Sequence, residues 1–299
     1  MTRARAPGKV VLSGAYAVLE GAPAIVSAVS RYVTADTIKP ATFATEEVQA
    51  ALCTGEQVPW FDAAELRENG RKLGLGSSAA ILVASLLALE RAANPLLSLD
   101  ELRALVLEAG LAAHREAQGG GSGVDVAAST YGGTLVYRKG APPHITPISL
   151  PAELRFEIWV CPSSASTREL IACVNALRGS DAAAHQRWLG AQVEASQQAA
   201  TAAERGDADA LLAALRGQQS ALAGLGAAAG APIVTPELAE LDPQARSEGG
   251  VLLPAGAGGG DVALFVGRAA SSAGLRAELQ KRSHQLLHTD MSAEGAVFL

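Results

Sequence analysis

The stretch "GRKLGLGSSAAILVASLLALE" (residues 70–90) places Gly74, Gly76 and two adjacent serines directly before a long apolar run. Glycine is a poor helix former and serine competes for backbone hydrogen bonds, so neither favours a helix interior. A helix N-terminus, however, carries unsatisfied N–H groups and the positive end of the helix dipole, which together attract phosphate. The stretch predicts a buried helix over 79–93 and an anion-binding loop before it. The alternative is a loop in which a serine only caps the helix.

Two familiar phosphate-binding motifs do not account for this loop. The pattern G-x-x-x-x-G-K-[ST] occurs nowhere in the chain. "GLGSSA" (74–79) matches the variant G-x-G-x-x-A of the dinucleotide fingerprint, but the preceding residues "ELRENGRK" are polar. Because a dinucleotide-binding unit requires a buried strand at that place, the sequence argues against it.

Two further small-residue loops each run directly into an aspartate. They are "GGGSGVD" (119–125) and "PAGAGGGD" (254–261). Three separated glycine clusters suggest three backbone segments that crowd one ligand, since glycine lets the backbone approach closely. Asp125 could orient or deprotonate a hydroxyl, or bind magnesium. For Asp125, and more so for Asp261, a plain turn residue is the alternative.

Lys9 follows "APG" (6–8) and precedes an apolar segment. A lysine ammonium is a compact charge on a long stem, suited to a transferring phosphoryl group, although a single lysine is usually a solvated surface residue. Phosphoryl transfer needs mainly positioning and charge neutralisation. Lysine, aspartate, hydroxyls and glycine amides are therefore a sufficient set of groups.

The pattern along the chain predicts an α+β fold, with strands in blocks rather than in regular alternation with helices. In the first half we expect strands at 10–19 and 24–33, weak helix near 63–68, and a helix stopped near Asn94-Pro95. Ser98 and Glu101 form a capping box for a second helix that ends at 119–123. A strand over 134–137 follows.

The second half begins after a proline-bearing connector at 142–151, which predicts domains at 1–150 and 151–299. We expect a strand at 155–162 and then a helix capped by Ser166, with Glu169 completing a capping box. Two alanine-rich helices over 181–229 follow. A strand, a glycine loop and a strand occupy 249–267, and a helix near 270–287 and a short strand at 295–299 complete the pattern.

Composition limits the class of protein. The chain has 299 residues, 49% hydrophobic and 18% charged, typical of a globular protein. Its net charge of −6 gives no electrostatic footprint for nucleic acid. The longest apolar run is too short for a membrane span, so neither nucleic acid nor membrane is an expected partner. Cys53, Cys161 and Cys173 lack metal-ligand spacing, which predicts buried, reduced thiols. Reduced thiols favour a reducing compartment, and the sequence shows no convincing signal-peptide cleavage site. We therefore expect a cytoplasmic protein.

Three segments in order, "APGKVVLSGAYAVLEG" (6–21), "GLGSSAA" (74–80) and "GAGGGD" (256–261), resemble the signature motifs of the GHMP kinases. The resemblance implies a ribosomal-protein-S5-like N-terminal domain joined to a ferredoxin-like C-terminal domain, with ATP at the "GLGSSAA" loop. "KLGLGSSAA", "AHREAQGGGSGVDVAASTYGG", "SASTRELI" and "GAGGGD" are similar to the phosphomevalonate kinases of this superfamily. The implied reaction is ATP- and magnesium-dependent phosphorylation of 5-phosphomevalonate to 5-diphosphomevalonate.

Carried over position by position, the resemblance implies a role for each of the following residues. Catalysis falls to Lys9 and Asp125, and magnesium to Ser78, with Asp125 as a second candidate. Nucleotide binding falls to Lys72, Gly74, Leu75, Gly76, Ser77, Ser78 and Ala79. Substrate binding falls to Tyr16, His114, Ser122, Gly123, Ser166, Thr167, Arg168, Gly256, Gly258, Gly259 and Gly260. His114 could instead only pack at its helix end, and Ser166 could only cap its helix.

The departures from the family pattern concern substrate identity. His114 stands eleven residues before Asp125, where mevalonate kinases carry a magnesium-binding glutamate. The segment 33–72, where part of a substrate lid is expected, is shorter than in many family members. Ala15, Ala255 and Val262 stand where other residues are common in the family. Mevalonate kinase, or a kinase of another small acid, is the alternative within the superfamily. Two alternatives come from other function classes: an ATP-dependent decarboxylase, a group whose members lack the motif-one lysine, and a non-catalytic relative that only binds a small molecule. The oligomeric state, monomer or homodimer, stays open.

Overall fold

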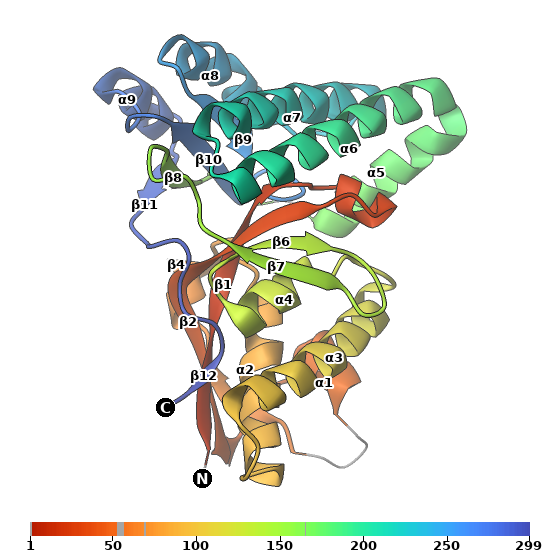
Figure 1. Cartoon of the computed structure of the whole chain (residues 1–299), viewed down its shortest axis with the longest axis vertical. Coiled ribbons are helices and arrows are strands. Elements are labelled where there is room, and N and C mark those ends of the chain that lie inside the picture. The colour runs from red at the N-terminus through yellow and green to blue at the C-terminus, as the bar shows by residue number, and fades with distance from the viewer. Residues whose placement is uncertain (1, 53–56, 69, 165) are drawn as a thin grey trace. The chain divides into compact units, whose positions relative to one another are not determined.

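The computed structural model describes residues 2–52, 57–68, 70–164 and 166–299. The chain forms two compact units, and each unit is built from segments that are not contiguous in sequence. The first unit consists of Met1–Val10, Val26–Tyr137 and Thr289–Leu299. The second consists of Val11–Ile25 and Arg138–His288. Figure 1 labels helices and strands of both units where there is room.

Strands β1 (Arg3–Ser13) and β2 (Ala24–Pro40) each run from one unit into the other. Within the first unit, the sheet order is β12-β1-β2-β6, and β3 also pairs with β2. The other elements of this unit, in chain order, are α1 (Glu46–Ala51), β3 (Pro59–Asp62), the 3-10 helix η2 (Ala64–Leu66), β4 (Arg67–Glu68), β5 (Arg71–Lys72), α2 (Ser77–Ala93), α3 (Leu99–Gln118), α4 (Val124–Tyr131), β6 (Thr134–Arg138) and β12 (Val297–Phe298).

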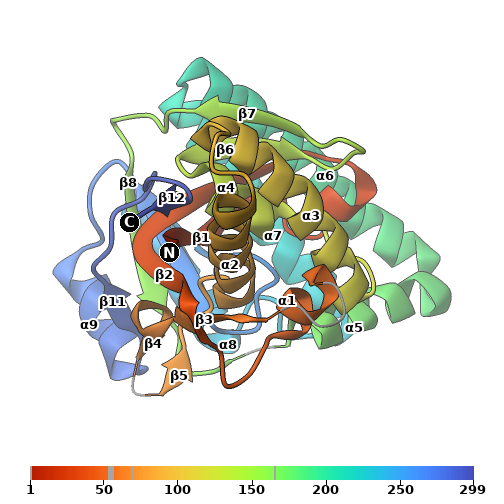
Figure 2. The same ribbon diagram turned by 90° about the horizontal axis from the view of Figure 1, so that it is seen from below.

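Helix α2 is the central helix of the first unit. Its residues from Ala79 to Ala88 are buried, so this part of the helix is enclosed around its whole circumference, and all of these residues except Ser85 are apolar. It packs against α3, α4, α1 and β3, and Figure 2 shows it beside α3. Leu82 and Leu87 are completely buried. Truncating either to alanine is expected to cost about 2–5 kcal/mol of stability.

The C-terminal segment returns to the first unit. β12 pairs antiparallel with β1, with Ala4 opposite Phe298, and Met291 forms a bridge to Val29. Buried hydroxyls also connect this segment to the sheet, because the Thr134 Oγ1 lies 2.9 Å from Ser27 Oγ and 2.7 Å from Ser292 Oγ. The last strand is therefore part of the first unit, although the whole second half of the chain precedes it.

The second unit contains a four-stranded antiparallel sheet in the order β11-β8-β10-β9. Its elements, in chain order, are the 3-10 helix η1 (Ala17–Glu20), β7 (His144–Ile148), β8 (Arg155–Val160), α5 (Thr167–Ser180), α6 (Ala182–Arg205), α7 (Ala208–Ala229), α8 (Pro236–Ser247), β9 (Val251–Pro254), β10 (Val262–Gly267), α9 (Ala273–Lys281) and β11 (Gln285–Leu287).

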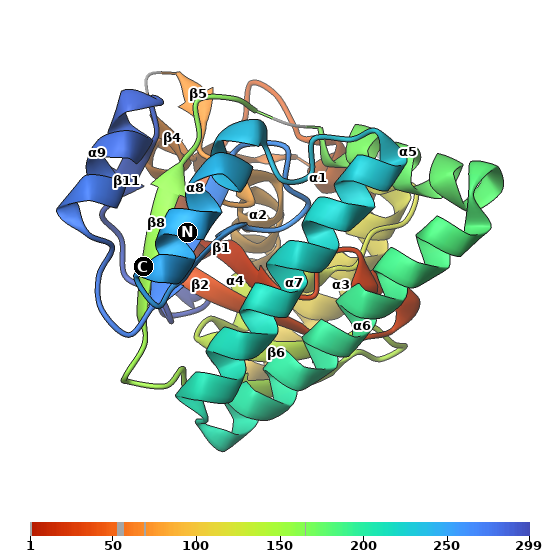
Figure 3. The same cartoon turned by 90° about the horizontal axis from the view of Figure 1, so that it is seen from above.

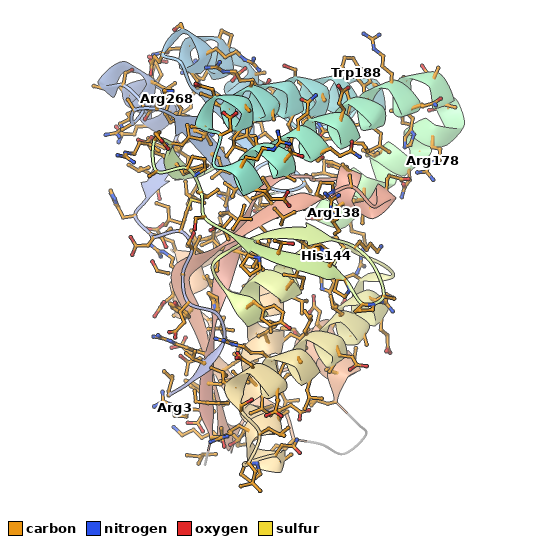
Figure 4. The ribbon with its side chains drawn as sticks, viewed as in Figure 1. Arg3, Arg138, His144, Arg178, Trp188 and Arg268 are labelled. Carbon is orange, nitrogen blue, oxygen red and sulfur yellow. The ribbon has the colours of Figure 1, made fainter. Side chains whose placement is uncertain are left out.

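Two apolar clusters stabilise this unit. Trp159 and Phe265 of the sheet pack with Leu238 of α8 and Leu275 of α9. Helices α6 and α7 lie side by side in Figure 3 and pack extensively. Gly224 of α7 makes room for the Trp188 ring of α6, since a Cβ at Gly224 would lie 2.5 Å from ring carbons. Trp188 is labelled in Figure 4.

Most of the predicted elements are confirmed. The α+β class, the buried helix α2, the capping box of Ser98 and Glu101, the strands at 134–138 and 155–160 and the two alanine-rich helices are all present. Ser166 caps α5 by accepting from the Glu169 N–H at 3.3 Å. The division at residue 150 stays a prediction about domains.

Three predictions about local structure are confirmed only in part. The strand predicted over 10–19 ends at Ser13, because Gly14 at φ 90° turns the chain and 17–20 form a 3-10 helix. A Cβ at Gly14 would lie 2.4 Å from the Pro23 carbonyl oxygen. Helix near 63–68 is limited to η2, after which β4 begins. The last helix ends at Lys281 rather than near 287, with Ser283 at φ 61°.

The cysteine prediction is partly confirmed. Cys161 and Cys173 are reduced, but only Cys161 is buried and Cys173 is half-buried. Cys53 lies outside the described residues. Within the part of the chain that the structure describes, no helix is both long and apolar enough to cross a membrane.

Candidate active site

Lys9 lies beside the first glycine loop. Its backbone N–H donates to the Leu75 carbonyl at 2.8 Å, which joins β1 to the loop. Its side chain, 15% exposed, passes over Gly76, where a Cβ would lie 2.7 Å from the lysine Cε. Gly76 also has φ 74°. Glycine at this position thus serves both the backbone conformation and the course of the lysine side chain.

The loop leads directly into the N-terminus of α2. Gly76 is the N-cap residue, and the first turn contains Ser77 and Ser78, both half-buried, and no acidic side chain. The first turn of a helix presents N–H groups without intrahelical partners together with the positive end of the dipole. The predicted phosphate-binding loop therefore has the backbone form that anion binding needs. Lys72, on β5, is exposed.

Asp125 lies in the first turn of α4, a helix that the sequence analysis did not predict. One carboxylate oxygen is 3.9 Å from Lys9 Nζ, and the other is 4.0 Å from His114 Nε2. The carboxylate is 25% exposed. Lys9 therefore meets Asp125 and His114 in the first unit, although it lies more than a hundred positions before them in the sequence.

The charge state of Asp125 follows from these neighbours. Burial by itself raises the pKa of this carboxyl group, but Lys9, His114 and a backbone hydrogen bond together outweigh burial. The net result is a lowered pKa. Asp125 is accordingly held as a carboxylate, which makes it a weak base and a strong partner for cations.

His114 is almost completely buried in the C-terminal half of α3. Its Nε2 faces Asp125, and a Cβ at Gly121 would lie 3.0 Å from the same nitrogen. Its Nδ1 has no hydrogen-bond partner among the described residues. His114 thus fills space at the helix end and faces the site aspartate, and its contact with a substrate oxyanion stays a prediction.

The second glycine loop holds the start of α4. Gly123 is the N-cap residue at φ 77°, and a Cβ there would lie 2.2 Å from Leu111 Cδ2. The Ser122 carbonyl accepts a 2.6 Å hydrogen bond from the Tyr137 hydroxyl. Ser129 Oγ of α4 donates to the Pro7 carbonyl at 2.8 Å, next to Lys9. Tyr137 and Ser129 support the site, but no short motif in the sequence signals either of them.

The remaining predicted residues belong to the second unit. Ser166, Thr167 and Arg168 are exposed at the N-terminus of α5, where the Ser166 hydroxyl serves as a cap. Tyr16 is buried, and its hydroxyl donates to the Ala257 carbonyl at 2.6 Å. The Tyr16 hydroxyl therefore already donates its proton to a hydrogen bond within the protein.

The third glycine loop is the hairpin connection between β9 and β10. Gly259 N–H donates to the Ile233 carbonyl at 3.0 Å, and a Cβ at Gly258 would lie 2.0 Å from that oxygen. Asp261, at φ 55°, accepts from Ser164 Oγ at 2.7 Å, and its backbone bonds to Ser163 and Cys161. These contacts favour the interpretation of Asp261 as a turn residue.

No three His, Cys, Asp or Glu side chains gather into a metal-binding group within the described ranges 2–52, 57–68, 70–164 and 166–299. Ser78 and Asp125 supply a hydroxyl and a carboxylate. Oxygen ligands of this kind suit Mg²⁺, which is usually held by one or two protein groups together with substrate phosphates and water. The donor set therefore fits a magnesium ion bound with a nucleotide.

Comparison with known proteins defines the class. Residues 56–133 match the family model of the GHMP kinases N terminal domain. The chain is 30% identical to a phosphomevalonate kinase of Streptomyces sp. (strain CL190), over 87% of this chain and 88% of the relative. It is 29% identical to a mevalonate kinase of Pyrococcus abyssi, over 57% of this chain and 60% of the relative.

A solved structure gives the same fold. The Streptococcus pneumoniae phosphomevalonate kinase in complex with phosphomevalonate and AMPPNP superposes with a TM-score of 0.76 at 19% identity, over 97% of this chain and 100% of the other. Fold and site together define an ATP-dependent small-molecule kinase. The chain belongs to the GHMP kinase family.

Proposed function

We propose that this kinase transfers the γ-phosphoryl group of ATP to the phosphate of 5-phosphomevalonate. An acceptor phosphate oxygen forms a bond to the γ-phosphorus, and the bond from that phosphorus to the β,γ-bridging oxygen breaks. The products are ADP and 5-diphosphomevalonate. The similarity over most of both chains to a phosphomevalonate kinase supports this acceptor.

The placement of Asp125, with one carboxylate oxygen 3.9 Å from Lys9 Nζ and the other 4.0 Å from His114 Nε2, is the observation that carries the proposal. A carboxylate held ionised between Lys9 and His114, with a lowered pKa, is poorly suited to remove a proton. An alcohol acceptor such as mevalonate needs that proton removed, whereas a phosphate monoester is already mostly ionised at neutral pH. The arrangement therefore favours a phosphate acceptor, with Asp125 acting as a positioning group.

The other residues of the first unit have roles in this scheme. The N-terminus of α2 and the loop 74–79 bind the ATP phosphates, and Lys72 contacts the nucleotide. Lys9 neutralises the charge that develops on the transferring phosphoryl group. Ser78 and Asp125 hold Mg²⁺, which neutralises charge on the phosphate oxygens when it is bound.

The second unit supplies the acceptor contacts. Ser166, Thr167 and Arg168 present a helix N-terminus and a cation to the anionic end of the acceptor. The loop 256–260 offers backbone amides to an anion, apart from the Gly259 N–H, which donates to the Ile233 carbonyl. We also propose a cytoplasmic location, which the three cysteines of the chain, too few and too widely spaced for a disulfide framework, support.

Product analysis tests the proposal. The protein is incubated with ATP, Mg²⁺ and 5-phosphomevalonate, the product is identified by phosphorus NMR, and carbon dioxide is measured. A pyrophosphate ester with stoichiometric ADP and without carbon dioxide supports the proposal. Carbon dioxide release would instead support a decarboxylase. If the protein does not turn over 5-phosphomevalonate, the proposal is rejected, whether or not another small acid supports ADP formation.

A further inference from the structure

Two of the four tyrosines hold a carbonyl oxygen of a glycine loop. The Tyr137 hydroxyl donates to Ser122 in the loop 119–123, and the Tyr16 hydroxyl donates to Ala257 in the loop 255–261. Both hydrogen bonds measure 2.6 Å, and both tyrosines are buried, with 1% of Tyr137 and 6% of Tyr16 exposed. Each unit therefore contains one hydrogen bond from a buried tyrosine hydroxyl to a glycine-loop carbonyl.

Tyr16 adopts an unusual backbone conformation to make its contact. Its φ is 62°, a region that side chains other than glycine rarely occupy unless the surroundings enforce it. The ring packs in an apolar cluster with Ala15, Leu170 and Val174, against which Ala257 also packs. Burial, and secondarily Cys173, raises the pKa of Tyr16, so the hydroxyl stays protonated and remains a donor.

Tyr137 acts on the loop that starts α4. Ser122 immediately precedes Gly123, the N-cap residue of the helix that carries Asp125 in its first turn. Burial, together with the charge of Asp125, raises the pKa of Tyr137 to about 12, so this hydroxyl is also a donor throughout the neutral range. Fixing the Ser122 carbonyl therefore fixes the start of α4 and the approach of Asp125 to Lys9.

Glycine-rich loops need such restraints because glycine has more accessible backbone conformations than any other residue. A peptide plane that rotates in one of these loops would turn a carbonyl oxygen toward the phosphate in place of an N–H group. We propose that Tyr16 and Tyr137 are positioning residues that hold the Ala257 and Ser122 carbonyls, so that anionic substrates meet loop amides. This assignment rests on the proposed function, and it replaces direct substrate contact as the role of Tyr16.

The test compares three identical substitutions, Tyr16→Phe, Tyr137→Phe and Tyr32→Phe. Each removes one hydroxyl and keeps the ring. Tyr32 is the control, because its hydroxyl also donates to a backbone carbonyl, that of Glu294 at 3.3 Å, but from a half-buried part of β2 and outside the glycine loops. The assay measures kcat and the KM of each substrate, with ADP release as the readout, together with Tm.

We expect Tyr137→Phe to lower kcat by about 10-fold with little change in either KM, because it loosens Asp125. We expect Tyr16→Phe to raise the KM of the acceptor by about 10-fold and to leave the KM of ATP within twofold. The pH profile keeps its shape in both, since neither hydroxyl transfers a proton. Tyr32→Phe stays within twofold of the wild type throughout.

Two results overturn the proposal. One is a lower Tm in Tyr16→Phe and Tyr137→Phe with all kinetic constants within twofold of the wild type, which means that the hydrogen bonds only stabilise the fold. The other is an equal kinetic loss in Tyr32→Phe, which means that the loss is not specific to the loops. Failure of the proposed function is distinguishable, since the wild-type protein would then show no turnover of 5-phosphomevalonate.

Discussion

The glycine loops of the two units look alike in sequence and do different structural work. In the first unit, the loops at 74–76 and 119–123 lead into the helices α2 and α4, and they lie beside Lys9, His114 and Asp125. In the second unit, the loop at 255–261 joins two antiparallel strands, and its aspartate bonds to Ser164. The two loops of the first unit therefore lie next to helix N-termini and charged side chains, whereas the loop at 255–261 mainly makes close backbone contacts.

The comparison predicts that charge in the first unit carries the largest effect. Lys9→Met and Asp125→Asn each remove one member of the ion pair, and each is expected to lower kcat by at least about 100-fold. Steady-state ADP release measures the loss. Ser164→Ala, which removes the partner of Asp261, is the counterpart in the second unit and is expected to change kcat by less than twofold. Near-normal turnover in either first-unit variant removes that residue from the site.

A smaller effect is expected at Gly76. Alanine there meets the Lys9 side chain and also strains a backbone at φ 74°, so we expect kcat/KM to fall by at least about 10-fold. Gly70→Ala separates the two causes, since Gly70 has φ 78° but open space around its Cβ position. That control is expected to lose about 1 kcal/mol of stability and no activity. If both variants lost the same fraction of kcat/KM, backbone strain alone would explain the loss at Gly76.

The lowered pKa of Asp125 predicts a pH-dependent contribution to stability. A group whose folded-state pKa lies below its unfolded value of about 4 stabilises fully above that value. The contribution is lost as the pH falls through the folded-state pKa. Urea unfolding of the wild type and of Asp125→Asn at pH 6 and pH 3 should therefore give a difference in unfolding free energy that shrinks at pH 3. A difference independent of pH would contradict the ion-pair assignment.

The smallest effects separate capping from substrate binding at Ser166. Ser98 and Ser166 both cap helices, α3 and α5, and each alanine variant is expected to lose about 1 kcal/mol of stability. If Ser166 also contacts the acceptor, only Ser166→Ala raises the acceptor KM, by a few-fold. An unchanged acceptor KM in both variants reduces Ser166 to a cap.

Features that depend on local sequence were predicted well. The capping box of Ser98 and Glu101, the burial of α2 and the hairpin strands around 255–261 each follow from neighbouring residues. Lys9, Asp125 and His114 were selected from their motifs, and the structure brings them together.

Features that depend on distant contacts were missed. The eight-residue helix α4 is short and contains two valines and a threonine, so its pattern is weak, and it forms on the N-cap Gly123 against α2 and α3. The turn at Gly14 follows from contact with Pro23 and Ala24. The hydroxyl contacts of Tyr16 and Tyr137 reach across 241 and 15 positions of the chain, beyond any local motif.

The central claim is that the acceptor is a phosphate and that Asp125 positions rather than deprotonates. The most direct test is the ratio of kcat/KM for 5-phosphomevalonate to that for mevalonate, from Mg²⁺-dependent ADP release in the same buffer. The account predicts a ratio of at least about 100, because the site holds its carboxylate ionised beside the Lys9 ammonium. A ratio below one would contradict it, since the alcohol would then be the acceptor and Asp125 would have to serve as the base.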